Sequence, residues 1–200
     1  MSREVQNTET QLAATPELIG LPHYERLPEI DLYMDQVMAY LEPYIQAYSS
    51  NLSGKLISPA IINNYVKQGI LPPPLKKKYT RDHLAHLMMI CVLKQVLPLQ
   101  SLMELLALQT KRYSLPEVYD RFCTDQEKSL RMASEIISSG ETSDFNALFA
   151  ELSPADASFE MAILATSTKI ALERFILQQE AAVDRTPSKP EGKKPKKNKG

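Results

Sequence analysis

The sequence predicts an all-α protein, and three observations lead to that prediction. Only 6 glycines occur in 200 residues, too few for the many tight turns that sheets and barrels require. Apolar residues recur at i, i+3, i+4 and i+7 in one segment after another, as in amphipathic helices. Serine, threonine, aspartate and proline stand at the starts of these segments, where helices favour them. The chain is 44% hydrophobic and 24% charged, which is typical of a folded protein.

The N-terminal quarter is predicted to hold a leader followed by one helix. Residues 1–27 show little periodicity and contain prolines, so we expect a flexible leader that docks late, through its apolar residues Leu18, Ile19 and Leu21. Asp31 is a good N-cap for the first helix, whose apolar residues are Met34, Val37, Met38, Leu41, Tyr44, Ile45 and Tyr48. Because Pro43 has no N–H to donate, this helix is expected to end or kink just before it.

Residues 58–68 form a short and well-marked helix. Ser58 supplies the N-cap, Pro59 fits the first turn, and Gly69 ends the helix. One face is apolar and consists of Ile61, Ile62, Tyr65 and Val66. The opposite face is polar and carries Asn63, Asn64, Lys67 and Gln68. Asparagine is a poor residue for a helix interior, so two in succession indicate a role beyond helix formation.

A basic segment over residues 72–79 follows this helix and is predicted to be extended. Three consecutive prolines, Pro72 to Pro74, favour a stiff extended backbone. The segment then continues through Lys76, Lys77, Lys78 and Tyr79. Thr80 comes directly after it and is the expected cap of the next helix.

Helices are predicted for most of the remaining chain. The helix capped by Thr80 has an apolar stripe consisting of Leu84, Leu87, Met88, Cys91, Val92 and Val96. Proline or glycine bounds the later helices, which we expect over residues 99–108, 116–140, 145–152 and 153–183. The last of them packs either on a second subunit or on the helix of residues 116–140. Residues 184–200 carry lysines, prolines and no large apolar side chain, so we expect them to be disordered.

Several classes of protein find no support in the sequence. The longest apolar run, Leu87 to Leu93, has seven residues, against about 20 for a membrane span. The two cysteines form no CxxC motif, so we expect neither a disulfide scaffold nor a zinc site, and a reducing cytoplasm suits them. His83 and His86 have no third ligand nearby, and no metal site is predicted. No nucleophile elbow, glycine-rich phosphate loop or HExxH motif occurs, so we predict neither enzyme activity nor a cofactor.

The net charge of −1 conceals a segregation of charge along the chain. Residues 1–51 carry −6 and residues 52–96 carry +6, whereas residues 97–184 carry −7 and residues 185–200 carry +6. A basic segment flanked by acidic ones is typical of a surface that binds a polyanion, although ordinary solvated charge is the alternative. The basic C-terminal tail is expected to act as a sequence-independent tether to nucleic acid.

The order of short helix, basic segment and capped helix suits the chemistry of reading DNA. Amide side chains can bond bidentately to adenine in the major groove. Lysine and arginine side chains neutralise phosphates, which adds affinity without reading sequence. On these grounds the candidate DNA contacts are Asn63, Asn64, Lys67, Gln68, Lys76, Lys77, Lys78 and Arg81.

The same residues resemble the MerR-type winged helix-turn-helix. That superfamily has a helix end Arg-aromatic-Tyr-Glu-x-x-Gly-Leu-x-x-Pro, then a wing Arg-x-Tyr and a capped helix. Similar features here are Asn63-Asn64-Tyr65-Val66-Lys67-Gln68-Gly69-Ile70-Leu71-Pro72 and Lys77-Lys78-Tyr79-Thr80. The motifs Leu-Tyr-Met-Asp-Gln (32–36), Asn-Asn-Tyr-Val-Lys (63–67), Lys-Lys-Tyr (77–79) and Leu-Lys-Gln-Val-Leu (93–97) also resemble an uncharacterised bacterial family within that superfamily.

The resemblance assigns roles to Tyr65, Lys77 and Tyr79. It implies that Tyr65 meets a DNA phosphate, although Tyr65 is equally well explained as a core residue. It implies that Lys77 replaces the wing arginine and that Tyr79 is the wing aromatic. Two positions depart from the superfamily pattern: Asn63 stands at its phosphate-binding arginine and Val66 at its glutamate.

These interpretations combine into one prediction of organisation and function. Residues 28–112 are expected to form a MerR-like winged helix domain, with residues 58–68 as recognition helix and residues 72–79 as the wing. Residues 113–183 are expected to form a helical region for oligomerisation or for an effector. The resemblance implies a homodimeric, sequence-specific transcription regulator on double-stranded DNA. The alternative is a winged-helix scaffold that binds another protein through its acidic flanks, without DNA.

Overall fold

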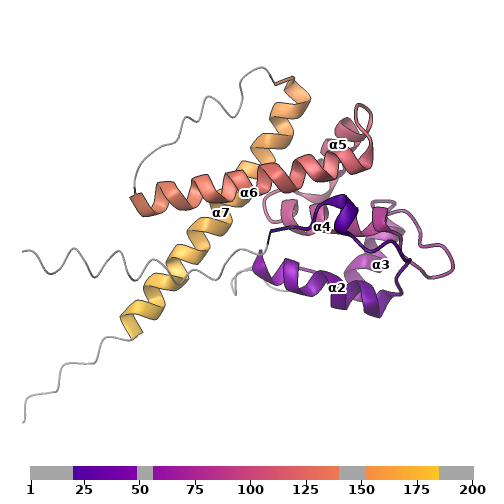
Figure 1. Cartoon of the computed structure of the whole chain (residues 1–200), viewed down its shortest axis with the longest axis horizontal. Helices are drawn as coiled ribbons and strands as arrows, with labels where there is room; N and C mark the ends of the chain where they lie inside the picture. Colours follow the sequence, from indigo (N-terminus) through magenta and orange to yellow (C-terminus); the bar gives the residue numbers. More distant parts are fainter. Residues whose placement is uncertain (1–19, 49–55, 140–151, 185–200) are drawn as a thin grey trace, which may run out of the picture.

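The structure, a computed structural model, describes residues 20–48, 56–139 and 152–184. In these ranges the chain is helical and its only β-pairings are isolated bridges, which confirms the predicted all-α class. A 3-10 turn, η2 (Tyr24–Arg26), precedes the α-helices α2 (Met34–Ala47), α3 (Pro59–Lys67), α4 (Arg81–Leu93), α5 (Leu99–Thr110), α6 (Leu115–Ser139) and α7 (Pro154–Asp184) (Figure 1). The predicted tail beyond residue 184 and nearly all of the predicted short helix at 145–152 lie outside the described residues.

The central helix of the fold is α4. Every residue from His83 to Leu93 except His86 is buried, and α2, α6 and α7 pack around it. A helix that is apolar on all sides belongs in a core. The predicted single stripe on α4 is therefore too narrow, and Val96 lies beyond the helix end, where it is only half-buried.

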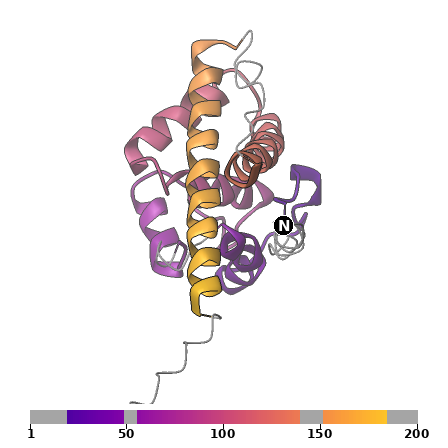
Figure 2. The ribbon, with the colours of Figure 1, turned by 90° about the vertical axis from the view of Figure 1, so that its left-hand side faces the viewer.

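Helices α6 and α7 form the most extensive helix pair. The Phe122 ring on α6 lies 6.1 Å from the Phe159 ring on α7, and the Gln126 side chain donates a hydrogen bond to Ser167 Oγ at 2.9 Å. Ile163 of α7 is fully buried by contacts within the single chain. Figure 2 shows α7 running along the length of the molecule. Of the two packings predicted for the last helix, the structure shows the one on α6.

Helix α2 differs from its predicted bounds at both ends. It begins at Met34 with Tyr33 as N-cap, not Asp31, because Leu32 is held in an extended bridge with Tyr79. It also continues through Pro43 to Ala47. Burial of the apolar residues on both sides of the proline outweighs the single hydrogen bond that it removes; these residues are Leu41 and Ile45.

Residues 20–27 are a packed part of the fold, which corrects the prediction of a flexible leader there. Leu21 and Leu27 are buried, and the predicted docking through Leu21 is confirmed. The Tyr24 N–H donates to the Asp120 carboxylate on α6 at 2.7 Å, and the Tyr24 hydroxyl bonds the Asp82 carboxylate on α4. Residues 1–19 lie outside the described part of the chain.

Candidate nucleic-acid interface

Helix α3 is attached to the protein by one face only. Ser58 Oγ accepts a hydrogen bond from the Ile61 N–H at 3.2 Å, and Pro59 is the first helical residue, as predicted. Ile62 and Tyr65 are buried. The opposite face is exposed and carries Asn63, Asn64, Lys67 and Gln68. The predicted division of this helix into an apolar and a polar face is confirmed.

The chain turns sharply at Gly69, after the end of α3. Its φ of +70° lies in the left-handed region that glycine adopts without strain. The Ile70 N–H donates to the Tyr65 carbonyl at 2.9 Å, and the Gly69 N–H donates to the Val66 carbonyl at 3.1 Å. These two hydrogen bonds define a Schellman motif. Leu71, two residues after Gly69, is fully buried. The segment that begins at residue 72 therefore leaves the core close to the end of α3.

The wing, residues 72–79, contains a tight reversal and is not extended throughout as predicted. Leu75 and Lys78 form an antiparallel bridge, and the Lys78 N–H donates to the Leu75 carbonyl at 2.9 Å. Between them, Lys76 and Lys77 have φ values of 50° and 65°. Positive φ at both central residues defines a type I′ turn, which usually contains asparagine and glycine. Two lysines carry no such signal, so the sequence did not indicate the turn.

The turn is therefore strained, and removing the strain should stabilise the protein. An L-residue in the left-handed region costs roughly 1–2 kcal/mol, and Asn-Gly fits a type I′ turn. We expect the double variant Lys76→Asn, Lys77→Gly to raise the free energy of unfolding by about 1–2 kcal/mol, measured by urea denaturation. The control pair Lys76→Ala, Lys77→Ala removes the charges but keeps the strain, and should give no gain. Equal stability of the two double variants would contradict a strained turn.

Hydrogen bonds to the core fix the base of the wing. Tyr79 and Leu32 exchange backbone hydrogen bonds of 2.8 and 2.9 Å. The buried His83 ring bridges two backbone groups at the base of the wing. Its Nδ1 accepts a hydrogen bond from the Thr80 N–H at 3.0 Å, and its Nε2 lies 3.2 Å from the Pro72 carbonyl. This geometry selects the neutral tautomer with the proton on Nε2, which donates to Pro72. His83 thus links the start of α4 to the first residue of the wing.

The burial of His83 makes stability depend on pH. Burial lowers the pKa of His83 and the neighbouring His86 lowers it further, which outweighs the opposite effects of the hydrogen bond to Pro72 and of Asp82. Below about pH 6.5 the unfolded chain takes up a proton on His83 that the folded protein resists, so stability falls as the pH falls. We expect the melting temperature to drop from pH 8 to pH 5 by more in the wild type than in His83→Gln, which keeps an amide donor and acceptor but does not titrate. Parallel melting curves for the two proteins would contradict this role.

Three lysines of the predicted interface remain available. Figure 1 shows α3 and the segment that joins it to α4 at the end of the molecule away from the C-terminal end of α7. Lys67 on α3 and Lys76 and Lys77 on the wing are exposed, and none of them forms an ion pair with another described residue. Their charges therefore face solvent without neutralisation by the rest of the described chain.

Two tyrosines of the predicted interface are core residues. Tyr65 is 4% and Tyr79 is 3% exposed. The Tyr65 hydroxyl accepts a hydrogen bond from the half-buried Lys94 amine at 3.3 Å, and burial raises the pKa of Tyr65 to about 12. The Tyr79 ring packs edge-on against His83 at 5.5 Å between centroids. We therefore remove both tyrosines from the candidate DNA contacts, because packing occupies them fully.

Two basic residues of the predicted interface are engaged by other side chains. The Lys78 amine lies 5.2 Å from the centroid of the Tyr33 ring. The Arg81 guanidinium is 3.6 Å from the Glu25 carboxylate and 3.4 Å from the Glu29 carboxylate. Only 16% of the Arg81 side chain is exposed. Arg81 thus fixes the N-terminal segment to α4, which corrects its prediction as a phosphate contact.

Comparison with known proteins gives one family. Residues 22–122 match the family described as a domain of unknown function (DUF1836). The chain belongs to this family. The DUF1836 match begins in the packed N-terminal segment and ends in α6, so it contains α3, the wing and α4. No curated protein and no solved structure matches the chain.

Within the DUF1836 region, the structure exposes three apolar side chains near the wing that sequence reasoning missed. Leu75 is 70%, Ile30 72% and Tyr33 49% exposed. Single apolar residues among prolines and charges have no periodicity from which exposure can be predicted. The His83 link was also missed, although Thr80-x-x-His83 has the spacing of a capping box, in which glutamate or glutamine is usual.

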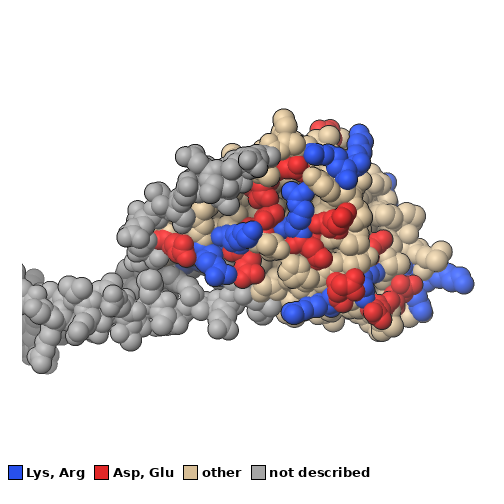
Figure 3. Space-filling model, turned by 45° about the horizontal axis from the view of Figure 1, so that its top comes forward, with Lys and Arg blue, Asp and Glu red and all other residues tan. Residues whose placement is uncertain are grey.

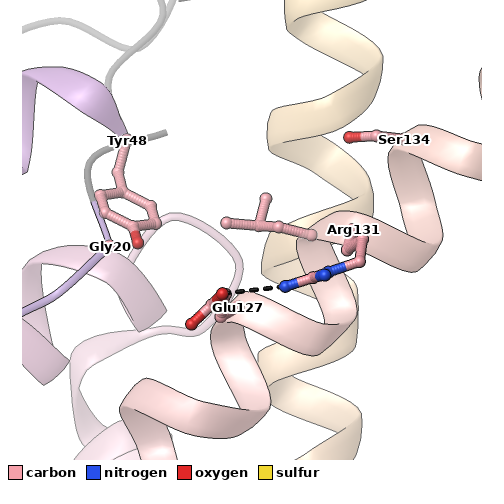
Figure 4. A pocket seen from close by; sticks show the side chains of 6 residues that line it. Gly20, Tyr48, Glu127, Arg131 and Ser134 are labelled. Carbon is pink, nitrogen blue, oxygen red and sulfur yellow. Dashed lines mark hydrogen bonds and ion pairs between the residues drawn. The ribbon is translucent and has the colours of Figure 1, made fainter. Parts of the chain in front are cut away.

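A hollow lies beside α6, and of the six residues that line it only Tyr48 falls within the DUF1836 match. It has a volume of about 310 Å³ and is lined by Gly20, Tyr48, Glu127, Leu130, Arg131 and Ser134 (Figure 4). Its two charged side chains are already paired, with 2.9 Å between the Arg131 guanidinium and the Glu127 carboxylate. Among the described residues that line the hollow, each charged side chain thus already has a partner, and the lining does not include α3 or the wing.

The described residues also bear on two other kinds of site. No cluster of three or more metal-ligating side chains occurs among them. No helix among them is both long and apolar enough to cross a membrane. The face displayed in Figure 3 carries acidic and basic side chains interspersed, not a field of one sign.

Proposed function

We propose that this protein is a sequence-specific DNA-binding regulator of transcription that acts in the cytoplasm, with residues 58–68 as recognition helix and residues 72–79 as the wing. The observation that carries the proposal is the exposed face of α3, where Asn63, Asn64 and Gln68 stand beside Lys67, which has no ion-pair partner among the described residues. Four residues separate the end of α3 from the wing, which adds two more exposed lysines that form no ion pair within the described part of the chain.

The dimensions and chemistry of α3 suit a major groove. Nine residues give a helix of about 13 Å, against a groove about 12 Å wide. Its exposed amides supply paired donors and acceptors for base edges, and Lys67 supplies a charge for phosphate. Ile62 and Tyr65 anchor α3 in the core, so the amides and Lys67 on its opposite face can meet a ligand.

The strained wing turn supports the same function. Strained backbone tends to persist at functional sites, where a residue type is retained despite its conformational cost. Here the cost falls on Lys76 and Lys77, although Asn-Gly would form the turn without strain. Lysine at these two positions is explained if the tip of the wing must carry two positive charges. Neighbouring DNA phosphates are the ligands that these charges would bind.

We also propose a MerR-like winged arrangement of α2, α3, the wing and α4, and a homodimer that reads paired half-sites. The Leu32–Tyr79 bridge supports the winged arrangement, because it joins the wing to the segment before α2. Self-association is supported by apolar side chains that α7 leaves exposed, Met161, Leu172, Phe175 and Ile176. Sedimentation equilibrium should give twice the chain mass of 22.6 kDa, and a monomer at all concentrations would contradict the dimer.

In vitro selection from a random duplex library tests the proposed function. The full-length protein should enrich one sequence and bind it at least about 10³-fold more tightly than random duplex. A variant lacking residues 185–200 should retain this selectivity, since a flexible basic tail adds only sequence-independent affinity. Binding without enrichment would contradict sequence-specific reading. No binding at low salt would favour the protein-interaction alternative instead.

A further inference from the structure

The outer face of the wing carries an apolar, a cationic and an aromatic side chain in a row. Leu75 pairs with Lys78 across one antiparallel bridge, and Leu32 pairs with Tyr79 across another. Opposite residues in such pairings point to one face, and neighbours along a strand alternate between faces. Leu32 and Tyr79 are buried, so Lys78 and Tyr33 point outward, and Leu75 shares the outer face with Lys78. The distance of 5.2 Å from the Lys78 amine to the Tyr33 ring agrees with this register.

Leu75 is the most exposed side chain of this outer face. It is 70% exposed and directly precedes the two strained lysines of the turn. Three prolines precede it, and their fixed φ limits the freedom of the segment to fold back. An exposed leucine alone is ordinary on a protein surface. Leu75, however, is held beside two exposed lysines that form no ion pair with any described residue, and this combination suits an anionic, partly apolar partner.

We propose that Leu75 is an apolar wedge that enters the minor groove of the duplex beside the α3 site, with Tyr33 and Lys78 against the adjacent sugar and phosphate. The inference rests on the proposed function. Apolar side chains inserted in the minor groove partly unstack a base step and kink the duplex. Lys76 and Lys77 follow Leu75 directly and are placed to meet phosphates on the groove edges.

The distribution of charge favours a groove over a flat anionic membrane. The tip of the wing is basic, but Glu25 and Glu29 lie near its base, paired with Arg81, and the two side chains are 85% and 87% exposed. A bilayer surface would approach the tip and these carboxylates together, and anionic lipid would repel the carboxylates. A groove receives a narrow tip and leaves the base of the wing outside.

The test compares full-length wild type with Leu75→Ala on a selected duplex labelled at both ends for energy transfer. Wild type should kink the duplex by roughly 20–90°, and Leu75→Ala should abolish the kink and bind about tenfold more weakly. The slope of log K against log[salt] should not change, because no charge is removed. Ile30→Ala is the matched control, an exposed apolar residue outside the paired strip, and should behave as wild type.

Four outcomes separate the possibilities. If wild type binds and kinks the selected duplex and Leu75→Ala does the same with equal affinity, the wedge is wrong while the proposed function stands. If wild type binds the duplex without a kink, the wedge is also wrong. If wild type binds no duplex, the proposed function fails and the wedge with it. If Leu75→Ala loses binding to phosphatidylserine vesicles but kinks DNA as wild type does, the wing serves a membrane and the proposal is overturned.

Discussion

Replacing Lys67, Lys76 and Lys77 with alanine should weaken binding to every duplex by about 10²-fold per subunit at physiological salt. These lysines are exposed and have no ion-pair partner among the described residues, so their charges are available to phosphates. The slope of log K against log[salt] should become shallower by about 3 per subunit, because three fewer counterions are released. Fluorescence anisotropy over a series of salt concentrations measures both quantities.

A control pair removes two lysines away from the proposed interface. Lys111→Ala with Lys128→Ala removes two exposed lysines, at the end of α5 and on α6. This pair should change the salt slope little. If the triple variant shows the wild-type slope, or if the control pair shows the larger change, the DNA interface lies elsewhere on the chain.

Asn64→Ala should change which sequence the protein prefers. Asn64 is exposed on α3, opposite the buried Ile62 and Tyr65, so replacing it should remove the proposed base contact without disturbing the core. We expect a loss of about 1–3 kcal/mol at one base position of the selected site and little change on random duplex. Gln100→Ala, at an exposed amide on α5, is the control and should leave the preference unchanged. A lowered melting temperature with unchanged preference would contradict the assigned role of this face.

Elements with local signals could be predicted from the sequence. The bounds of α3 follow from Ser58, Pro59 and Gly69, each of which acts within one turn of the helix. The exposed polar face of α3 was also predicted, because helical periodicity places Asn63 and Asn64 opposite the apolar residues. Helices α5, α6 and α7 were predicted for the same reason.

Features set by distant residues could not be predicted. Tyr33 replaces Asp31 as the cap of α2 because Leu32 pairs with Tyr79, far along the chain. Arg81 is occupied by Glu25 and Glu29. Along the sequence, the two glutamates belong to an acidic segment and Arg81 to a basic one. Counting charge by segment therefore could not reveal that the three side chains neutralise one another in the fold.

The candidate site was therefore predicted in composition but not in shape. Lys76 and Lys77 were predicted to contact phosphates, yet the turn that presents them has no sequence signal, since lysine rarely adopts positive φ. Tyr65 and Tyr79 were assigned to DNA by resemblance, and their burial depends on the packing of α3 and the wing against α4. Burial of a tyrosine cannot be deduced from its position in a motif alone.

Photo-crosslinking from α3 tests the central claim most directly. A photoreactive amino acid is placed at Asn64 in the full-length chain, and at Gln100 on α5 in a control protein; both positions are exposed. With the selected duplex bound, the probe at position 64 should cross-link to bases within the site, and the probe at position 100 should give no cross-link to the site. A duplex that is bound equally well but cross-links from position 100, or from neither position, would contradict the assignment of α3 as the recognition helix.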